Sequence, residues 1–473
     1  MRTVIPSETT EAALVRGASD LDEPATTTPV QRTGRRHWIE DWRPEDREFW
    51  DGGGDRIARR NLVQSVFSEH VGFSIWAMWS VFVLFLGPEY GIDPSRKFLL
   101  TTVPAAVGAA MRIPYTFAVA KFGGRNWTIV SGLLLFIPMV AAAITLRPGV
   151  SFNALLVAAA LAGFGGGNFS SSMSNIDSFY PQRLKGWALG INAGGGNIGV
   201  AAIQLVGLAV LATAGAAHPR IILGVYMPLV VLSVLGAALR MDNISGLTNE
   251  RHAMRDVCRE PMAWVICVLY VGTFGTFIGF SFAFGQVLQV QFADTFDTPL
   301  KAAYLTFLGP LLGSLIRPVG GRLADRFSGS VITLYTFVAM AVGAGVVLLA
   351  SSTGSLPMFI FGFVVLFVLS GLGNGSTYKM IPAIFRARQQ LAVADGQDPE
   401  VAARNARRLS GALIGIAGAV GTFGGVAVNL AFRQSFLDSG TGDAAYIAFI
   451  GWYAVCFVVT WVVFRRRATG QLV

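Results

Sequence analysis

The sequence predicts an all-α membrane protein with twelve transmembrane helices in two pseudo-symmetric six-helix halves. Three observations support this fold class. Hydrophobic residues make up 53% of the 473 residues and charged residues only 14%, whereas soluble domains carry about 25% charged residues. Twelve apolar stretches have about the length that a helix needs to cross a bilayer, roughly 20 residues. Signatures of the first six stretches recur in the second six.

The chain begins with a polar segment that is rich in Thr, Pro, Glu, Asp and Arg. We expect no secretory signal peptide in it, because it lacks an apolar core. Its composition predicts a largely disordered cytoplasmic tail, in which 37–50, with three tryptophans, forms a juxtamembrane element. The predicted division is a tail over 1–57, a first half over 58–240, a central cytoplasmic loop over 241–260, a second half over 261–466 and a cytoplasmic tail over 467–473.

The apolar stretches fall into two groups of six, with Lys and Arg in short clusters between them. In the first half the predicted helices cover 62–86, 98–120, 128–146, 154–174, 187–213 and 221–239. In the second half they cover 262–290, 302–316, 331–350, 358–384, 413–432 and 445–464.

The positions of the basic residues predict the orientation of the chain. An even number of helices puts both termini on one side, and basic clusters such as Arg59–Arg60 and Arg465–Arg467 fall on that side. The opposite loops hold fewer, among them Arg147 and Lys301. Positive loops face the cytoplasm, so a multi-pass inner-membrane protein with both termini inside is predicted. The net charge of +9 then reflects topology rather than binding of nucleic acid.

The two halves repeat each other at two places. In the second helix of each half, Gly108 to Arg112 parallels Gly313 to Arg317, and a proline follows each arginine. In the fourth helix of each half, a Gly-Asn pair is followed by hydroxyl residues, at 167–171 and at 373–377. Such symmetry predicts a transporter whose site lies at the interface of the repeats.

Arg112 and Arg317 are the strongest candidates for substrate binding. An arginine inside an apolar helix costs about 2.5–3.5 kcal/mol on insertion scales. Equivalent positions in the repeat should bring the two side chains face to face, where they repel unless an anion lies between them. The planar guanidinium suits a planar oxyanion. The structural alternative is that each arginine pairs with a helix carbonyl or a carboxylate.

Two glycine-rich stretches, 163–172 and 190–199, supply the next candidates. Close helix packing explains most of the glycines. It does not explain the asparagines Asn168, Asn192 and Asn197, whose amides are costly in lipid without a partner. An amide N–H facing the cavity would help to hold an anion. A dinucleotide site is excluded because no βαβ pattern surrounds the glycines.

These stretches, together with the segments 112–115, 122–125, 270–281 and 371–377, resemble the nitrate/nitrite porter family of the major facilitator superfamily. The resemblance extends from about residue 59 to residue 466. It implies that Arg112 and Arg317 clamp nitrate or nitrite, that Tyr270 donates its hydroxyl and that Phe169 stacks on the ion. Phe274 and the amides of Asn192 and Asn197 complete the implied site, and Ala193 departs from the glycine that is usual in the family signature.

The segment 320–329, which contains Asp325 and Arg326, resembles the cytoplasmic loop motif of the superfamily. We expect its charges to form a latch between helix ends, although they could also serve only to orient the chain. By the symmetry of the halves, Asp177 is predicted to pair with Lys379 as a gate.

The coupling mode stays open between two alternatives. Exchange of nitrate for nitrite is electroneutral and needs no proton group, and it is slightly favoured because no acidic residue follows or precedes either arginine within a turn. Proton symport would need a titratable group, for which Glu69, His70 and Asp177 are the candidates. Each could equally be structural.

Other functions fit the sequence less well. A carrier for organic anions would share the twelve helices, and a channel would not need the two-half repeat. No cofactor, metal cluster or Ser/His/Asp constellation is predicted, so we expect no enzyme. Cys258, Cys267 and Cys456 have no ligand-like spacing. The predicted partners are nitrate, nitrite and the lipid bilayer, with the chain as a monomer.

Overall fold

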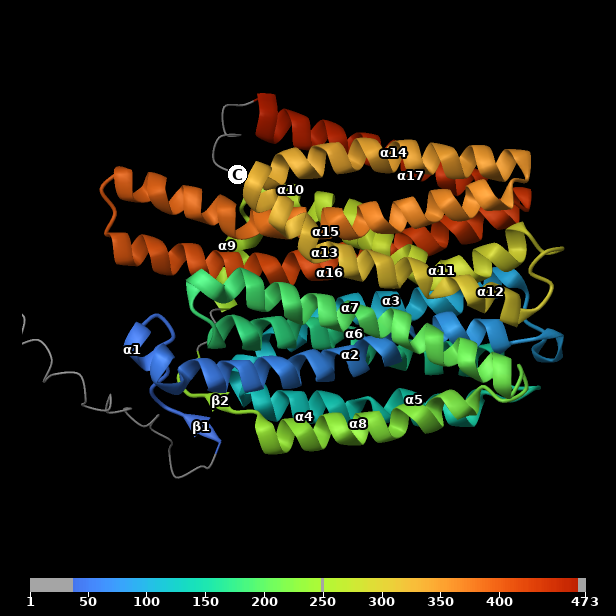
Figure 1. Cartoon of the computed structure of the whole chain (residues 1–473), viewed down its shortest axis with the longest axis horizontal. Helices are drawn as coiled ribbons and strands as arrows, with labels where there is room; N and C mark the ends of the chain where they lie inside the picture. The colour runs from blue at the N-terminus through green and yellow to red at the C-terminus, as the bar shows by residue number, and fades with distance from the viewer. Residues whose placement is uncertain (1–36, 248–250, 467–473) are drawn as a thin grey trace, which may run out of the picture.

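The computed structural model describes residues 37–247 and 251–466, which are helical except for two short strands. Within these residues, twelve helices are long and apolar enough to cross a membrane. They run side by side along the long axis of the molecule (Figure 1). The fold-class prediction of two six-helix halves is therefore confirmed. The disorder predicted for the N-terminal tail falls mostly on residues 1–36, which lie outside the described residues, as does 467–473.

The first half contains six membrane-spanning segments, one of which is divided into two helices. Their bounds are α2 Asp55–Phe85, α3 Pro94–Phe122, α4 Gly124–Leu134 with α5 Phe136–Thr145, α6 Phe152–Phe179, α7 Gln182–Thr213 and α8 Arg220–Arg240. A short 3₁₀ turn, η2 Pro88–Tyr90, connects α2 to α3.

The second half repeats this arrangement with two divided segments. Its helices are α10 Pro261–Tyr270 with the wide turn η3 Val271–Gly275 and α11 Thr276–Gln291, α12 Pro299–Thr306 with α13 Leu308–Phe327, α14 Gly329–Thr353, α15 Leu356–Ala394, α16 Pro399–Ser439 and α17 Asp443–Thr460, which ends in a wide turn, η4 Trp461–Arg466. Ten of the twelve predicted stretches lie within these segments, and the other two, 62–86 and 128–146, extend one residue past the ends of α2 and α5.

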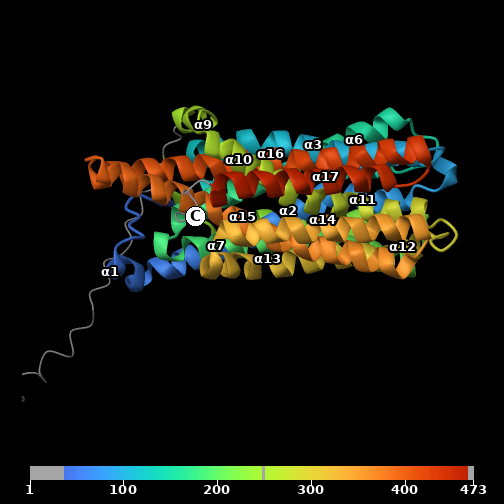
Figure 2. The same ribbon diagram turned by 90° about the horizontal axis from the view of Figure 1, so that it is seen from above.

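Two helices extend well past the predicted apolar stretches. The predicted 358–384 and 413–432 lie inside α15 and α16, which are 39 and 41 residues long. The two helices form a hairpin that projects beyond the rest of the bundle (Figure 2). Hydropathy marks only the part of a helix in contact with lipid, whereas the extra turns carry polar and basic residues such as Arg388 and Arg404.

The described part of the N-terminal tail is folded against the same end of the bundle. Strand β1 Trp38–Ile39 pairs in parallel with β2 Asn243–Ile244 of the central loop. Two short helical turns follow, α1 Arg47–Phe49 and η1 Trp50–Gly54. Asp242, next to β2, holds the central loop against the first half, since it accepts hydrogen bonds from Arg60 and Asn61 on α2. The N-terminal segment therefore ties the linker between the halves to the first half. The rest of the central loop includes α9 Arg251–Cys258.

Glycines allow helices within each half to approach closely. In the first half, a Cβ at Gly165 on α6 would lie 3.1 Å from the backbone nitrogen of Trp76 on α2. In the second half, a Cβ at Gly371 on α15 would lie 2.7 Å from the carbonyl carbon of Gly313 on α13. Small residues are what permits such backbone contacts in membranes. They fix the positions of the helices that carry the site.

Candidate functional site

Arg112 lies at the centre of the molecule, on α3. Its side chain is fully buried, and its Nη1 donates a hydrogen bond of 3.0 Å to the carbonyl oxygen of Gly418 on α16. The guanidinium carbon lies 4.5 Å from the ring centroid of Phe169 and 5.0 Å from that of Phe274. The positive charge therefore contacts aromatic faces, which attract cations.

Arg317 approaches the same place from the second half. It lies on α13 and is 4% exposed. Its Nη2 donates a hydrogen bond of 3.2 Å to the hydroxyl of Tyr270. The guanidinium carbon lies 6.0 Å from the ring centroid of Phe274 and 5.6 Å from that of Tyr378. The two arginines thus converge on one ring, that of Phe274, as the repeat predicts.

The aromatic rings form a stack between the halves. Tyr270 and Phe274 are nearly parallel, with centroids 5.1 Å apart and planes 9° apart. Phe274 in turn stacks on Phe169 at 6.1 Å. The wide turn η3 follows directly after Tyr270 and contains Phe274. Such turns recur at functional sites, and here the turn lies where both rings meet the arginines.

A glycine face of α16 makes room for these side chains. A Cβ at Gly421 would lie 2.5 Å from the Tyr270 ring, and a Cβ at Gly418 would lie 3.3 Å from Nη1 of Arg112. Any larger residue at Gly421 would therefore displace the tyrosine. The tight fit explains why so large a group of side chains can be buried at the centre of the bundle.

Several hydrogen-bond donors at this site have no partner among the described residues. They are Nε and Nη2 of Arg112 and Nη1 of Arg317. Within residues 37–247 and 251–466, the ion pairs do not include either arginine. Buried, unpaired guanidiniums are costly. Donors and charge together favour binding of a small planar anion.

The structure places the two predicted asparagines of α7 differently. Asn197 is 1% exposed, and neither its amide nitrogen nor its oxygen has a hydrogen-bond partner among the described residues. The amide N–H groups of Asn197 are therefore available to bind a ligand. Asn192, by contrast, donates to Glu69 at 2.7 Å and to Ser172. The structure therefore directs the Asn192 amide to a carboxylate, and its predicted role towards the anion is corrected accordingly.

The predicted gate pair is not formed in this structure. Asp177 pairs with Lys185 at 3.1 Å, because both lie where α6 turns into α7. Lys379 pairs instead with Asp325 at 2.8 Å and links the interior of α15 to the last turn of α13. Asp325 of the segment 320–329 thus makes an ion pair within the second half, and its role as a latch stays a prediction. Arg326 is exposed and lies over the ring of Phe327.

Glu69 and His70 occupy different environments, although they are neighbours on α2. Glu69 is 1% exposed and lies in the polar group formed with Ser172 and Asn192. His70 is half-buried, and its Nδ1 lies 3.3 Å from the carbonyl oxygen of Gly195. Adjacent residues of a helix point in different directions, and these two side chains bond to different partners.

Other residues of the site have weaker signals in the sequence. Phe73 and Trp76 lie one and two turns after Glu69, and the Trp76 ring is 5.6 Å from the Arg112 guanidinium. Tyr378 follows the second Gly-Asn signature directly and could have been found from it. Ser172 ends the first glycine-rich stretch. Gly418 contributes only a carbonyl oxygen, for which no sequence pattern exists.

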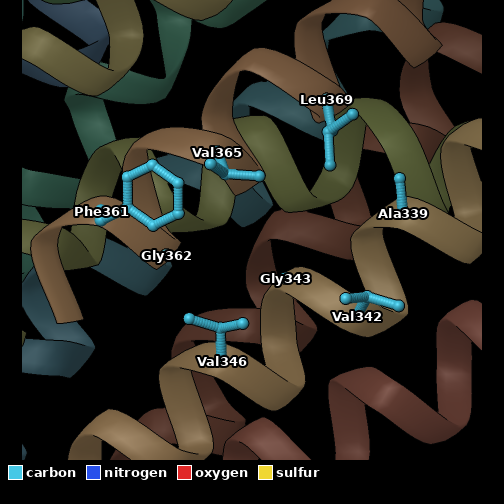
Figure 3. A pocket seen from close by; sticks show the side chains of 8 residues that line it. All are labelled: Ala339, Val342, Gly343, Val346, Phe361, Gly362, Val365 and Leu369. Atoms are coloured by element: carbon cyan, nitrogen blue, oxygen red, sulfur yellow. The ribbon is translucent and has the colours of Figure 1, made fainter. Parts of the chain in front are cut away.

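A separate apolar groove lies on the side of the second half, between α14 and α15 (Figure 3). Gly343 and Gly362 form the floor at which the two helices come close, and aliphatic and phenylalanine side chains surround it. It contains no polar side chain. The groove therefore does not suit an anion.

Replacing Tyr270 by Phe should weaken anion binding at least about tenfold, because one hydrogen bond to a charged group contributes about 1.5–3 kcal/mol. Removing the hydroxyl leaves Nη2 of Arg317 without its partner and takes one donor from the site. Binding affinity measured on purified protein tests this. Tyr453→Phe is the control, since it removes a hydroxyl that contacts Thr276 at 3.1 Å and should leave affinity unchanged. Equal affinities of wild type and Tyr270→Phe would contradict the assignment.

Comparison with known proteins places the chain in a family of membrane transporters. The sequence profile described as Major Facilitator Superfamily matches residues 71–394. The chain is 35% identical over 458 residues to the nitrate/nitrite transporter NarU of Salmonella typhimurium, covering 92% of this chain and 98% of that protein. It is 30% identical to the probable nitrate/nitrite antiporter NarK2 of Thermus thermophilus, and the match covers 93% of this chain and 99% of that protein. The solved structure of a D-xylose-proton symporter has a similar fold, with a TM-score of 0.64 and 13% sequence identity. The match covers 86% of this chain and 97% of that chain.

Proposed function

Because the chain belongs to the Major Facilitator Superfamily and, within it, to the family of the NarU nitrate/nitrite transporters, we propose that it carries nitrate and nitrite across the membrane by alternating access. The arginines Arg112 and Arg317 hold the anion. It is a transporter and not an enzyme. Each half supplies one arginine to this site, and the two halves move relative to each other around it.

The observation that carries the proposal is the set of unpaired donors at the centre of the bundle. Three guanidinium nitrogens of Arg112 and Arg317 have no partner among the described residues. Nitrate and nitrite are planar oxyanions, and an arginine fork matches planar oxyanions with two parallel hydrogen bonds. The stacked ring of Phe274 offers a flat surface beside them. The buried amide of Asn197, which has no partner among the described residues, is the further donor that we propose for the anion.

We propose exchange of nitrate for nitrite as the mode of transport. Each negative charge that enters against the membrane potential costs about 2.3 kcal/mol per 100 mV, and one-for-one exchange avoids this cost. The relative NarK2 is named a probable antiporter, which supports this choice over net proton symport.

The contacts between the halves indicate which conformation this is. At the end away from the described termini, Thr101 on α3 donates to Asn429 on α16 at 2.9 Å. Phe98 stacks on Phe436 there, with ring centroids 5.6 Å apart. Gln204 on α7 donates to the Ser281 carbonyl on α11 at 2.9 Å. With both termini in the cytoplasm, as we propose from the basic loops, this end faces outward and is closed.

Uptake of labelled nitrate into proteoliposomes, with and without internal nitrite, tests the proposal. We expect uptake that depends on internal nitrite and is not driven by a pH gradient. Absence of nitrate uptake by folded protein would overturn the substrate. Uptake that a pH gradient drives in the absence of internal anion would overturn exchange. We further propose that the transporting unit is a monomer in the inner membrane, since each chain contains a complete site.

A further inference from the structure

A buried carboxylate lies beside the anion site and is not needed to hold the anion. Glu69 on α2 is 1% exposed. Its Oε2 accepts hydrogen bonds from Ser172 on α6 and, at 2.7 Å, from Asn192 on α7. Its Oε1 has no hydrogen-bond partner among the described residues. The ion pairs of the described chain do not include Glu69.

Burial favours the protonated form of the Glu69 carboxyl, and the hydrogen bond from Ser172 and the charges of the two arginines favour the ionised form. Arg112 on α3 and Arg317 on α13 are both within electrostatic range of the carboxylate. The side chains that face it from α6 and α7 are neutral, and α15 contributes Tyr378. His70 points to the Gly195 carbonyl instead. An opposite charge nearby favours the ionised carboxylate, and an additional anion favours the protonated form.

A line of polar side chains leads along α2 from this carboxylate towards the end that carries the termini. It follows helical spacing and is buried throughout, and its members are Asn61, Gln64, Ser65, Ser68 and Glu69. Ser65 lies 2.9 Å from Ser172, which bonds to Glu69. Gln64 and Ser233 on α8 both bond to Ser68. Asn61 bonds to Asp242 of the central loop. Polar groups at such density inside a membrane helix mark ion or proton pathways.

We propose that Glu69 is a proton-binding site linked to the anion site, so that the loaded carrier holds an anion and a proton together. The inference rests on the proposed function. Without the anion, and above the pH at which the buried carboxyl ionises, Glu69 offsets part of the charge of the two guanidiniums. When the anion binds, it takes over this role, and one carboxylate oxygen binds a proton. The net charge of the site is then unchanged. In one-for-one exchange a proton crosses with each anion in both directions, so no net proton is transported.

The test is the affinity of the purified full chain for nitrate at different pH values, across roughly pH 5 to 9. Linkage requires that binding which takes up a proton weakens as the pH rises, by up to about tenfold per pH unit for one proton. We expect this dependence in the wild type and in Glu69→Asp, which keeps a carboxyl group. Glu69→Gln should bind nitrate with an affinity that does not change with pH.

His70→Gln is the matched control, because it removes the neighbouring titratable group on α2, and it should retain the pH dependence. A dependence that vanishes in His70→Gln and persists in Glu69→Gln would overturn the assignment. Nitrate binding that is independent of pH in the wild type would overturn the inference and leave the proposed function standing. No nitrate binding at any pH would overturn the proposed function instead.

A second measurement needs no variant. Nitrate is added to wild-type protein in weakly buffered solution that contains a pH-sensitive dye. We expect alkalinisation that corresponds to uptake of up to one proton per nitrate bound. Binding without any proton uptake across the tested pH range would overturn the inference.

Discussion

Replacing Arg112 or Arg317 by Lys should lower the affinity for nitrate at least about a hundredfold, because each charge-assisted hydrogen bond contributes about 1.5–3 kcal/mol and lysine loses more than one of them. Lysine keeps the charge but lacks the planar fork. It also cannot reproduce the contact of Arg112 with Gly418 or that of Arg317 with Tyr270. Transport should fall to the level of liposomes without protein.

Arg96→Lys is the control for this prediction. Arg96 begins the same helix as Arg112, but it is exposed and pairs with Asp93 at 3.2 Å. The same chemical change at Arg96 should leave nitrate affinity and uptake unchanged. Both properties are measured on protein that elutes as a single peak, so that misfolding is excluded. A variant Arg112→Lys or Arg317→Lys that transports at the wild-type rate would refute the arginine clamp.

Gly371→Ala should destabilise the second half by about 1–3 kcal/mol or more, which is the usual cost of overpacking. The new Cβ would lie 2.7 Å from the carbonyl carbon of Gly313. Backbone atoms cannot change rotamer to relieve the clash as a side chain can, so α15 and α13 must separate. Since α13 carries Arg317, the separation also displaces one arm of the site. We expect a lower thermal unfolding temperature and a strong loss of transport.

The matched control is Gly345→Ala on α14, where a Cβ would meet nothing within 4 Å. Alanine has a higher helix propensity than glycine by about 1 kcal/mol, so this variant should be as stable as the wild type or slightly more stable. Thermal unfolding of both variants in the same detergent decides the matter. If Gly371→Ala unfolds at the wild-type temperature, the close contact between α13 and α15 is not needed for stability.

Much of the fold could be predicted from the sequence. All twelve predicted helices are present, because a chain in lipid must satisfy its backbone hydrogen bonds within helices and because apolar length reports the thickness of the bilayer. The repeat also predicted that Arg112 and Arg317 approach each other, and they meet at Phe274. The resemblance to a family predicted three aromatic residues of the site, Tyr270, Phe169 and Phe274. The structure places all three beside the arginines.

Other features depended on contacts between segments that are distant in the sequence. Asn192 was expected at the anion and instead donates to Glu69. Lys379 pairs with Asp325 and Asp177 with Lys185, although symmetry suggested that Asp177 and Lys379 would pair. Symmetry relates helix positions, but it does not determine which of several nearby charges a flexible side chain reaches.

The sequence by itself therefore determined the number of helices, the two halves and the pair of arginines, since hydropathy and repeats are local properties of the chain. Only the tertiary structure decided which side chains share a hydrogen bond. The link from Ser65 through Ser172 to Glu69 joins α2 to α6, and the Gly418 carbonyl reaches Arg112 from α16. Such contacts depend on how closely the helices pack and on how each helix is rotated about its axis. Both are determined by glycine contacts between segments that are distant in the sequence.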